Sequence, residues 1–405
     1  MFSLQFTTLD LILIGIVAVC VAGLLLYYIP LNRRVTRRVE ADTAEIEGGA
    51  LDLIADAAYP SVSVIVYVNG NAVGLAEMLP YILEQDYPAP MEVIVVNDGP
   101  RAVIEDAIGD LEMRYNNLYM TFTPPNSRNL SRKKLSLMLG VKAARYDTLM
   151  MTTASCRPCS PLWLRSMMRH VAAGDDIVIG MSVDVATDEA PRRRESRIAA
   201  FDIASEKGRY LSWAIKGRPY RADGNNLAYR REVFTANRGF STHLNFNFGD
   251  DDIFIHQVAR NRRTSVELSQ ASVVRQLSDD LKKSHSFDKL RYDFTGRHIK
   301  TDTRYRQGLA STAWWVWALV SLAIIVKGVL TMQFVMPAAT VVLGVALCVP
   351  VMVSWRHLTT ALYLRRLTLT VPWMMLAYPF YNLAYRYRGY RNKTKNYTWT
   401  SEKLF

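Results

Sequence analysis

Three long apolar runs set the strongest limit on what this chain can fold into. Residues 11–29, LILIGIVAVCVAGLLLYYI, contain no charged side chain. At about 1.5 Å of rise per residue, a helix of this length spans the hydrocarbon core of a bilayer. Two further runs, residues 309–326 and 334–354, are separated by a short piece whose only charged residue is Lys327. The sequence therefore predicts a multi-pass membrane protein with one N-terminal transmembrane helix and a C-terminal transmembrane hairpin.

Basic residues gather on one side of these runs. No Lys or Arg precedes residue 11, whereas four arginines follow the first run and further basic residues flank both ends of the hairpin. Since Lys and Arg favour the cytoplasmic side, this pattern predicts that the N-terminus lies outside and the remaining soluble parts lie in the cytoplasm. A cleaved signal peptide is disfavoured, because no basic residue precedes the run and no small-residue cleavage site follows it.

Composition supports the same interpretation. The net charge is +12, yet half of the residues are hydrophobic and only 21% are charged. A basic nucleic-acid binder is normally more polar, so no nucleic-acid partner is expected. Surplus positive charge in an apolar chain suits contact with anionic membrane lipid.

A fourth apolar piece, residues 367–384, is interrupted by Pro372 and Pro379 and is followed by five basic residues. If it crossed the membrane, those residues would lie outside. We favour an interfacial or re-entrant segment with a basic tail on lipid headgroups, and a fourth crossing is the alternative. The predicted organisation is an anchor (1–32), a polar connector (33–59), a soluble domain (60–307), a hairpin (308–354), and an interfacial segment with tail (355–405).

The soluble domain alternates between strand and helix patterns. Apolar, β-branched strands are predicted at 61–68, 91–98, 118–123, 147–153 and 176–185, with helices at 75–84, 102–114, 132–144 and 161–172. This alternation predicts an α/β fold with a mainly parallel sheet covered by helices on both faces. Ligands on such sheets bind beyond the carboxyl ends of the strands, so the loops that follow the first, second and fourth strands are expected to share a crevice.

Two polar segments near this crevice each have a structural and a functional interpretation. Asn97, Asp98 and Gly99 end the second strand, where Asp98 can accept hydrogen bonds from a ribose or a base, but the same triplet also makes an ordinary turn. A basic group precedes and opens the next helix, and it suits a phosphate-bearing ligand or else forms a solvated basic face: Arg128, Arg132, Lys133 and Lys134.

Three adjacent carboxylates, Asp250, Asp251 and Asp252, precede another predicted helix. They can cap that helix and offset its dipole. Alternatively, Asp251 acts as a general base, because clustered carboxylates raise one another's pKa and suit proton abstraction from a hydroxyl. The residues alone leave both interpretations open.

Taken in order, these segments resemble the family 2 glycosyltransferases of GT-A fold, in particular membrane-anchored bacterial members. The resemblance covers residues 61–300, and the membrane arrangement extends it over nearly the whole chain. The segments that carry the resemblance are SVSVIVYVNGN, LPYILEQDYP, MEVIVVNDG, RKKLSLMLGVKAARYD, LMMTTASCRPCSPLWL, GRPYRADGNNLAYRREVF and GDDDIFIHQVA.

The resemblance implies a bacterial inner-membrane enzyme of envelope or polysaccharide biosynthesis. Such an enzyme transfers a sugar, with inversion, from a nucleotide-sugar donor to a lipid-linked or envelope saccharide, and can have protein partners in the same process. By position, Asp251 corresponds to the base, with Asp250 and Asp252 in support. Donor contacts fall on Asn69, Asn97, Asp98, Lys133, Lys134, Thr153 and Ser155, and the acceptor side on Gly224, Asn225 and Asn226.

The chain also departs from that family. Asn69-Gly70 replaces Asn-Glu after the first strand, and Thr153-Ala154-Ser155 replaces the Asp-x-Asp element that holds Mn²⁺ or Mg²⁺ on the donor diphosphate. Neutral hydroxyls are poor ligands for these ions, so no metal ligand is assigned. The Gln-x-x-Arg-Trp element is missing too, and Arg291 and Arg297 are the cations that could supply comparable charge to a diphosphate.

The sequence leaves two functions open. One is a working glycosyltransferase in which Lys133, Lys134 or Arg291 neutralises the diphosphate. The other is a catalytically degenerate protein that keeps the glycosyltransferase fold and serves as a binding or scaffold subunit in an envelope-polysaccharide complex.

Overall fold

The structure is a computed structural model that describes residues 7–70, 73–124, 130–187 and 195–391. It consists of two compact units. The helical unit comprises residues 1–36, 196–209 and 301–385, and the α/β unit comprises residues 37–195, 210–300 and 386–405.

The α/β unit is built on a mixed sheet. Among the described residues, seven strands pair in the order β3-β2-β1-β4-β8-β6-β9, and all neighbours are parallel except those of β8, which is antiparallel to both β4 and β6. The strands are β1 (Val62–Val68), β2 (Met91–Asn97), β3 (Leu118–Phe122), β4 (Thr148–Thr153), β6 (Ile177–Ile179), β8 (Leu227–Arg230) and β9 (Thr264–Val266). A second sheet has the order β5-β10-β7, formed by β5 (Cys156–Pro158), β10 (Val274–Ser278) and β7 (Ser182–Ala186).

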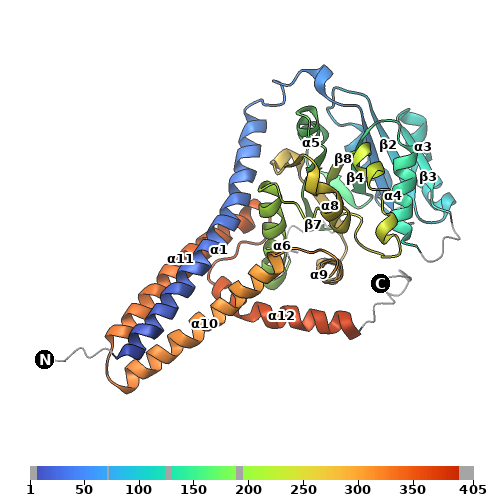
Figure 1. Cartoon of the computed structure of the whole chain (residues 1–405). Helices are drawn as coiled ribbons and strands as arrows, with labels where there is room; N and C mark the ends of the chain where they lie inside the picture. Colours follow the sequence, from blue (N-terminus) through green and yellow to red (C-terminus); the bar gives the residue numbers. More distant parts are fainter. Residues whose placement is uncertain (1–6, 71–72, 125–129, 188–194, 392–405) are drawn as a thin grey trace. The chain divides into compact units, whose positions relative to one another are not determined.

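Helices surround the large sheet, as Figure 1 shows. The helices of the α/β unit include α2 (Leu75–Leu83), α3 (Arg101–Arg114), α4 (Arg132–Ala143), α5 (Trp163–Ala172), α7 (Arg231–Ala236), α8 (Asp252–Val258) and α9 (Leu281–Thr295), of which α9 contacts β7 of the small sheet. The mainly parallel α/β fold predicted from the sequence is confirmed, and the elements predicted between residues 61 and 172 begin and end within two residues of the observed ones.

The alternation of side chains along β1 assigns its two faces. Val64 and Val66 belong to the hydrophobic core that also contains residues of α2, α3 and α5. Ile65 points the other way, toward α4, where a Cβ added at Gly140 would lie 2.7 Å from its Cγ2 atom. Gly140 therefore lets α4 pack closely on the sheet. Because successive side chains alternate, Tyr67 lies on this same α4 face, at the carboxyl end of the strand.

The strand predicted at 176–185 is two strands in the structure. β6 belongs to the large sheet and β7 to the small one, and the chain changes sheets at Gly180 and Met181. A side chain at Gly180 would collide with Asn226, whose side-chain atoms lie 2.5 Å from an added Cβ. The break is hidden in the sequence because residues on both sides of it are apolar.

The segment predicted as a polar connector is helical over much of its length. α1 (Thr8–Glu47) continues as one helix well beyond the first apolar run. Its last turns are held in the α/β unit by Asp42, which is fully buried and accepts hydrogen bonds from the guanidinium of Arg169 at 3.1 Å and from the backbone N–H of Leu268 at 3.0 Å. Asp42 therefore fixes this end of α1 by buried contacts, whereas Arg37, Glu40 and Glu47 on the same stretch are exposed.

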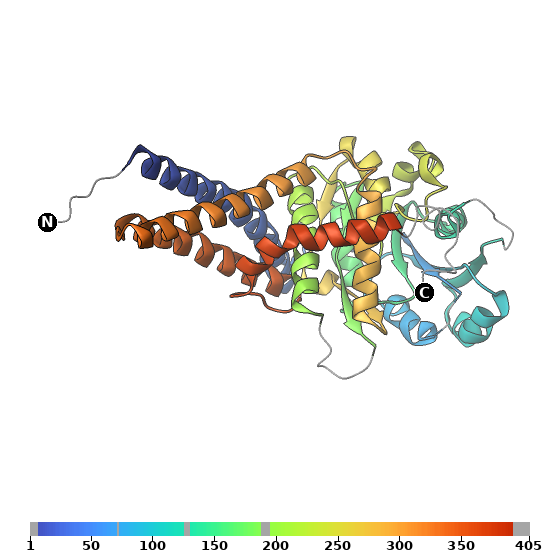
Figure 2. The same cartoon turned by 90° about the horizontal axis from the view of Figure 1, so that it is seen from below.

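The helical unit contains the apolar part of α1, residues 197–209 of α6 (Arg197–Ile215), α10 (Thr303–Leu330), α11 (Val335–Ala361) and most of α12 (Val371–Arg391). In both views α1, α10 and α11 lie side by side (Figures 1 and 2). The Phe201 ring of α6 stacks on Trp355 of α11 at 4.4 Å between centroids, and the Tyr378 hydroxyl of α12 donates to Asp202 at 2.8 Å.

Among the described residues, three helices are long and apolar enough to cross a membrane: α1, α10 and α11. These are the predicted anchor and hairpin. Many of their large apolar side chains are exposed, as lipid-facing surfaces require. The helix α12 is not among the three, and the end of the predicted basic tail, residues 392–405, lies outside the described residues. The orientation of the helices across a membrane stays a prediction.

Candidate active site

The carboxyl ends of β1 and β2 meet the first turn of α4. Tyr67 faces α4, and its hydroxyl donates to the Asp98 carboxylate at 3.1 Å. Arg132, the first residue of α4, pairs with the same carboxylate at 2.6 Å. Sequence reasoning gave Tyr67 no role, although a polar aromatic side chain at the end of an apolar strand was a usable signal.

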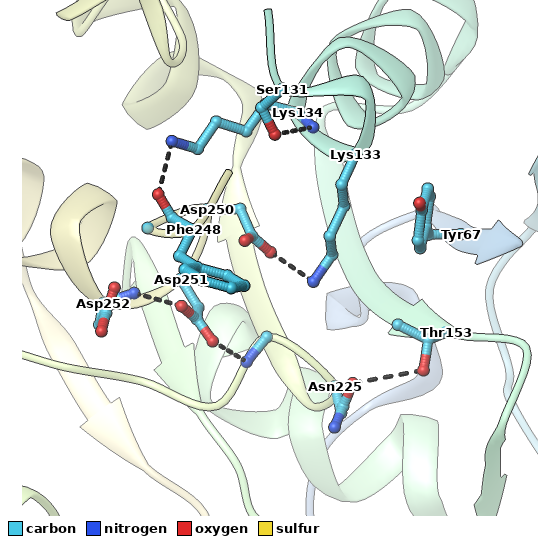
Figure 3. Close-up of polar contacts among 12 residues, drawn as sticks. Tyr67, Ser131, Lys133, Lys134, Thr153, Asn225, Phe248, Asp250, Asp251 and Asp252 are labelled. Carbon is cyan, nitrogen blue, oxygen red and sulfur yellow. Dashed lines mark hydrogen bonds and ion pairs between the residues drawn. The ribbon is translucent and has the colours of Figure 1, made fainter. Parts of the chain in front are cut away.

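Lys133 extends from α4 toward Asp250, as Figure 3 shows. Its ammonium lies 2.7 Å from an Asp250 carboxylate oxygen and 5.8 Å from the centre of the Tyr67 ring. Burial alone would lower the pKa of Lys133, but the carboxylates of Asp250 and Asp251 raise it above its ordinary value. In turn, burial would raise the pKa of Asp250, whereas Lys133, Arg291 and Lys134 together hold it below its ordinary value. The pair is therefore ionised on both sides.

Lys134 points away from Lys133 and is fully buried. Its ammonium donates to three backbone carbonyl oxygens, those of His243 at 2.7 Å, Phe246 at 3.0 Å and Phe248 at 2.8 Å. Burial lowers the pKa of Lys134 to about 7. All three of its donors serve the segment that leads into Asp250, so Lys134 fixes that segment rather than facing a ligand.

Asp251 begins α8 as its N-cap residue. Its carboxylate accepts hydrogen bonds from the backbone N–H groups of Asp252 at 2.7 Å and Gly224 at 3.2 Å (Figure 3). The predicted capping interaction is thus present. The same carboxylate also lies 3.2 Å from the guanidinium of Arg291 on α9, a contact that capping does not require.

Burial raises the pKa of Asp251 to about 7. Arg291 opposes this rise, while the neighbouring charges of Asp252 and Asp250 add to it. A carboxyl group with this pKa exchanges its proton near neutral pH, as a general base must. Asp252 is fully buried like Asp251, accepts a hydrogen bond from the Thr295 hydroxyl and lies 3.6 Å from Arg221.

The loop at residues 223–226 lies beside these carboxylates. Gly224 approaches Asp251 so closely that an added Cβ would be 3.1 Å from the Cβ of Asp251. The side-chain oxygen of Asn225 accepts from the Thr153 hydroxyl at 3.3 Å, and its side-chain amide donates to Gln276 at 2.6 Å. Asn226 is fully buried and accepts from the Trp163 indole, and its amide donates to two backbone carbonyls. Asn226 therefore holds the loop, while Gly224 and Asn225 border the site.

Of the polar residues predicted after β1 and β2, Asn97 is engaged in the turn itself. Its side chain accepts from the Gly99 N–H at 2.8 Å and donates to the carbonyl of Pro100 at 3.1 Å. Asp98 contacts both Tyr67 and Arg132, and Asn69 is exposed. The turn interpretation of the triplet thus describes Asn97, and only Asp98 presents a charged group beside the basic end of α4.

The residues at the end of β4 form a neutral polar cluster. The Thr153 hydroxyl lies 3.2 Å from the Ser155 hydroxyl and 3.1 Å from the Cys156 sulfur. Tyr67 pairs with Thr153 in the parallel register of β1 and β4, so their side chains lie next to each other on one face.

In the described contacts of Arg297, its side chain pairs with Asp293 and not with the residues of this site. It pairs with Asp293 one turn earlier on the exposed surface of α9, at 2.7 Å, and its side chain is 45% exposed. Arg291, in contrast, lies among the buried carboxylates. Of the two arginines predicted to face a diphosphate, the structure brings only Arg291 to the acidic cluster.

The family model described as Glycosyl transferase family 21 matches residues 17–395, which is most of the chain. The chain belongs to this family. It is therefore a glycosyltransferase, and the GT-A glycosyltransferase class predicted from the resemblance is confirmed, with family 21 as the matching family.

A solved structure shows the same fold. A mannosyltransferase from Pyrobaculum calidifontis, in complex with GDP-Man and Mn²⁺, is 18% identical to this glycosyltransferase with a TM-score of 0.51, covering 93% of this chain and 99% of that one. The glucosyl-3-phosphoglycerate synthase of Mycobacterium tuberculosis, in complex with Mn²⁺ and UDP-glucose, is 12% identical with a TM-score of 0.39, covering 59% of this chain and 79% of that one. No curated protein sequence matches this chain.

Proposed function

We propose that this glycosyltransferase moves a sugar from a nucleotide-sugar donor to a hydroxyl of a lipid-linked or envelope saccharide acceptor, with inversion at the anomeric carbon. The observation that carries the proposal is the buried Asp251 carboxyl, which lies between the Gly224 N–H and Arg291 and has its pKa raised to about 7. A group with these properties can accept a proton from an attacking hydroxyl at neutral pH.

The reaction is a single displacement. The acceptor oxygen forms a bond to the anomeric carbon while the bond from that carbon to the donor diphosphate breaks. The acceptor proton passes to Asp251, and the electron pair leaves with the diphosphate. Arg291 restrains the Asp251 side chain, and Lys134 holds the segment that precedes it, so this carboxyl is fixed before the acceptor arrives.

The membrane helices support the choice of acceptor. Three helices long and apolar enough to cross a membrane belong to the same chain as the α/β unit. An enzyme seated on a membrane meets lipid-linked substrates at its surface. We place it in the bacterial inner membrane with the α/β unit in the cytoplasm, on the basis of the arginines that follow the first apolar run.

The experiment is a transfer assay on the purified full chain in detergent with a panel of nucleotide sugars and bacterial lipid extract. We expect sugar to be transferred to lipid. The Asp251→Asn variant should lower the transfer rate by about 100- to 10,000-fold, the usual contribution of a general base. The Asp147→Asn variant, changed at an exposed carboxylate, is the matched control and should retain full activity.

A second candidate is favoured by the residues at the end of β4. Thr153, Ala154 and Ser155 offer neutral groups where the resemblance implies carboxylates, as expected of a protein that keeps the fold as a scaffold subunit. A scaffold subunit of this kind binds no nucleotide, so titration of the full chain with nucleoside diphosphates separates it from the transferase.

A further inference from the structure

The end of β4 does not fit a divalent metal ion. Its side-chain oxygens are the hydroxyls of Thr153 and Ser155, which lie 3.2 Å apart and are neutral. Mg²⁺ and Mn²⁺ favour carboxylate oxygens. Within the described residues, no group of three or more His, Cys, Asp or Glu side chains is arranged to hold a metal ion. Two acidic side chains near Tyr67, Asp98 and Asp250, already pair with Arg132 and Lys133.

A donor diphosphate nevertheless needs positive charge, because negative charge grows on the leaving group as the glycosidic bond breaks. The cations around the site differ in what they contact. Lys134 has all three donors on backbone carbonyls. Arg291 lies between Asp251 and Asp288, at 3.2 and 3.4 Å. Neither side chain can turn to a phosphate without leaving buried groups unsatisfied.

Lys133 is different. Its side chain is 26% exposed, and its described contacts are one ion pair with Asp250 and the face of the Tyr67 ring. An ammonium has three N–H donors, so one can remain bonded to the Asp250 carboxylate while the other two donate to phosphate oxygens. Tyr67 and Thr153 are register partners, and Lys133 lies over the Tyr67 ring. Lys133 is therefore close to the end of β4, where the resemblance implies a metal ion.

We propose that this enzyme binds the diphosphate of its donor without a divalent ion, with the Lys133 ammonium supplying the positive charge at the carboxyl end of β4. Asp250 is a positioning residue in this arrangement, because its ion pair with Lys133 keeps the ammonium charged and holds it over the Tyr67 ring. The inference rests on the proposed function, because it assumes a nucleotide-sugar donor.

The test is calorimetric titration of the full chain in detergent with UDP, GDP and dTDP as probes, first in EDTA and then with Mn²⁺. We expect at least one nucleotide to bind in EDTA, with an affinity that Mn²⁺ changes less than about threefold. Lys133→Ala should weaken this binding by about 10- to 100-fold, the range for a lost charge-assisted hydrogen bond. Lys133→Arg, which keeps the charge, should recover much of the affinity.

The matched control is Lys142→Ala, an exposed lysine near the end of the same helix, which should bind as the unaltered protein does. Thermal unfolding in detergent shows whether each variant is folded. Binding that requires Mn²⁺, or binding in EDTA that Lys133→Ala leaves unchanged, overturns the inference while the transferase proposal stands. Binding of no probe under either condition overturns both.

Discussion

The guanidinium of Arg291 lies 3.2 Å from the carboxylate of Asp251, and the two residues come from different helices, α9 and α8. This contact joins the triple-Asp motif at the start of α8 to α9. It also offsets part of the effect of burial on the pKa of Asp251, because Arg291 favours the ionised form whereas burial disfavours it.

The first prediction concerns pH. Because burial raises the pKa of Asp251 to about 7 and a base must be unprotonated, the transfer rate should fall as pH drops below 7 and level off above it. In Arg291→Gln the opposing charge is lost, so the pKa of Asp251 should rise further, and the transfer rate should begin to fall at a higher pH than in the unaltered protein. Initial rates between about pH 5.5 and 9, on either side of this pKa, measure both. A transfer rate that is independent of pH, or one that begins to fall at a lower pH in the variant, contradicts the assignment of Asp251 as the general base.

The second prediction separates two adjacent lysines. Lys134→Met leaves the carbonyls of His243, Phe246 and Phe248 buried without their donor and should reduce the stability of the folded protein by about 2 to 4 kcal/mol. Thermal unfolding in detergent measures the loss, and Lys142→Met is the control at an exposed position of α4. Equal melting temperatures for Lys134→Met and the control contradict the role assigned to Lys134.

The third prediction compares two helical glycines. Gly140→Ala places a methyl group 2.7 Å from Ile65 and 2.9 Å from Val96, so α4 must move off the sheet at a cost of about 1 to 3 kcal/mol. In Gly109→Ala no atom lies within 4 Å of the new methyl group, so this change in α3 should stabilise the protein by about 0.5 to 1 kcal/mol. Opposite shifts in melting temperature are expected, and shifts of the same sign contradict the close packing of α4 on the sheet.

Sequence periodicity predicted most of the α/β unit because each early strand and helix there carries its own pattern. It could not place the break at Gly180, since the apolar run continues across the junction and the close approach of Asn226 to Gly180 involves residues far apart in the sequence. Likewise, the connector was predicted as polar, and the pattern gave no sign that Asp42 would be buried against Arg169.

The candidate site shows the same limit. The triple-Asp motif and the basic start of α4 were visible in the sequence, but adjacent residues of a helix point in different directions. Only the fold shows that Lys133 contacts the Asp250 carboxylate and that Lys134 donates to the backbone carbonyl of His243. Asn226, predicted at the acceptor side, is buried and hydrogen-bonded to Trp163 and Met181, contacts that depend on residues far away in the sequence.

The most direct measurement of the central claim is sugar transfer by Asp251→Asn compared with the donor affinity of the same variant, in the full chain and in one buffer. We expect the rate to fall by about 100-fold or more. The dissociation constant for the donor should change less than about threefold, since Lys133 and not Asp251 is proposed to contact the diphosphate. Transfer by Asp251→Asn at the rate of the unaltered protein would show that another group takes the acceptor proton, and a mechanism with Asp251 as the base would then be wrong.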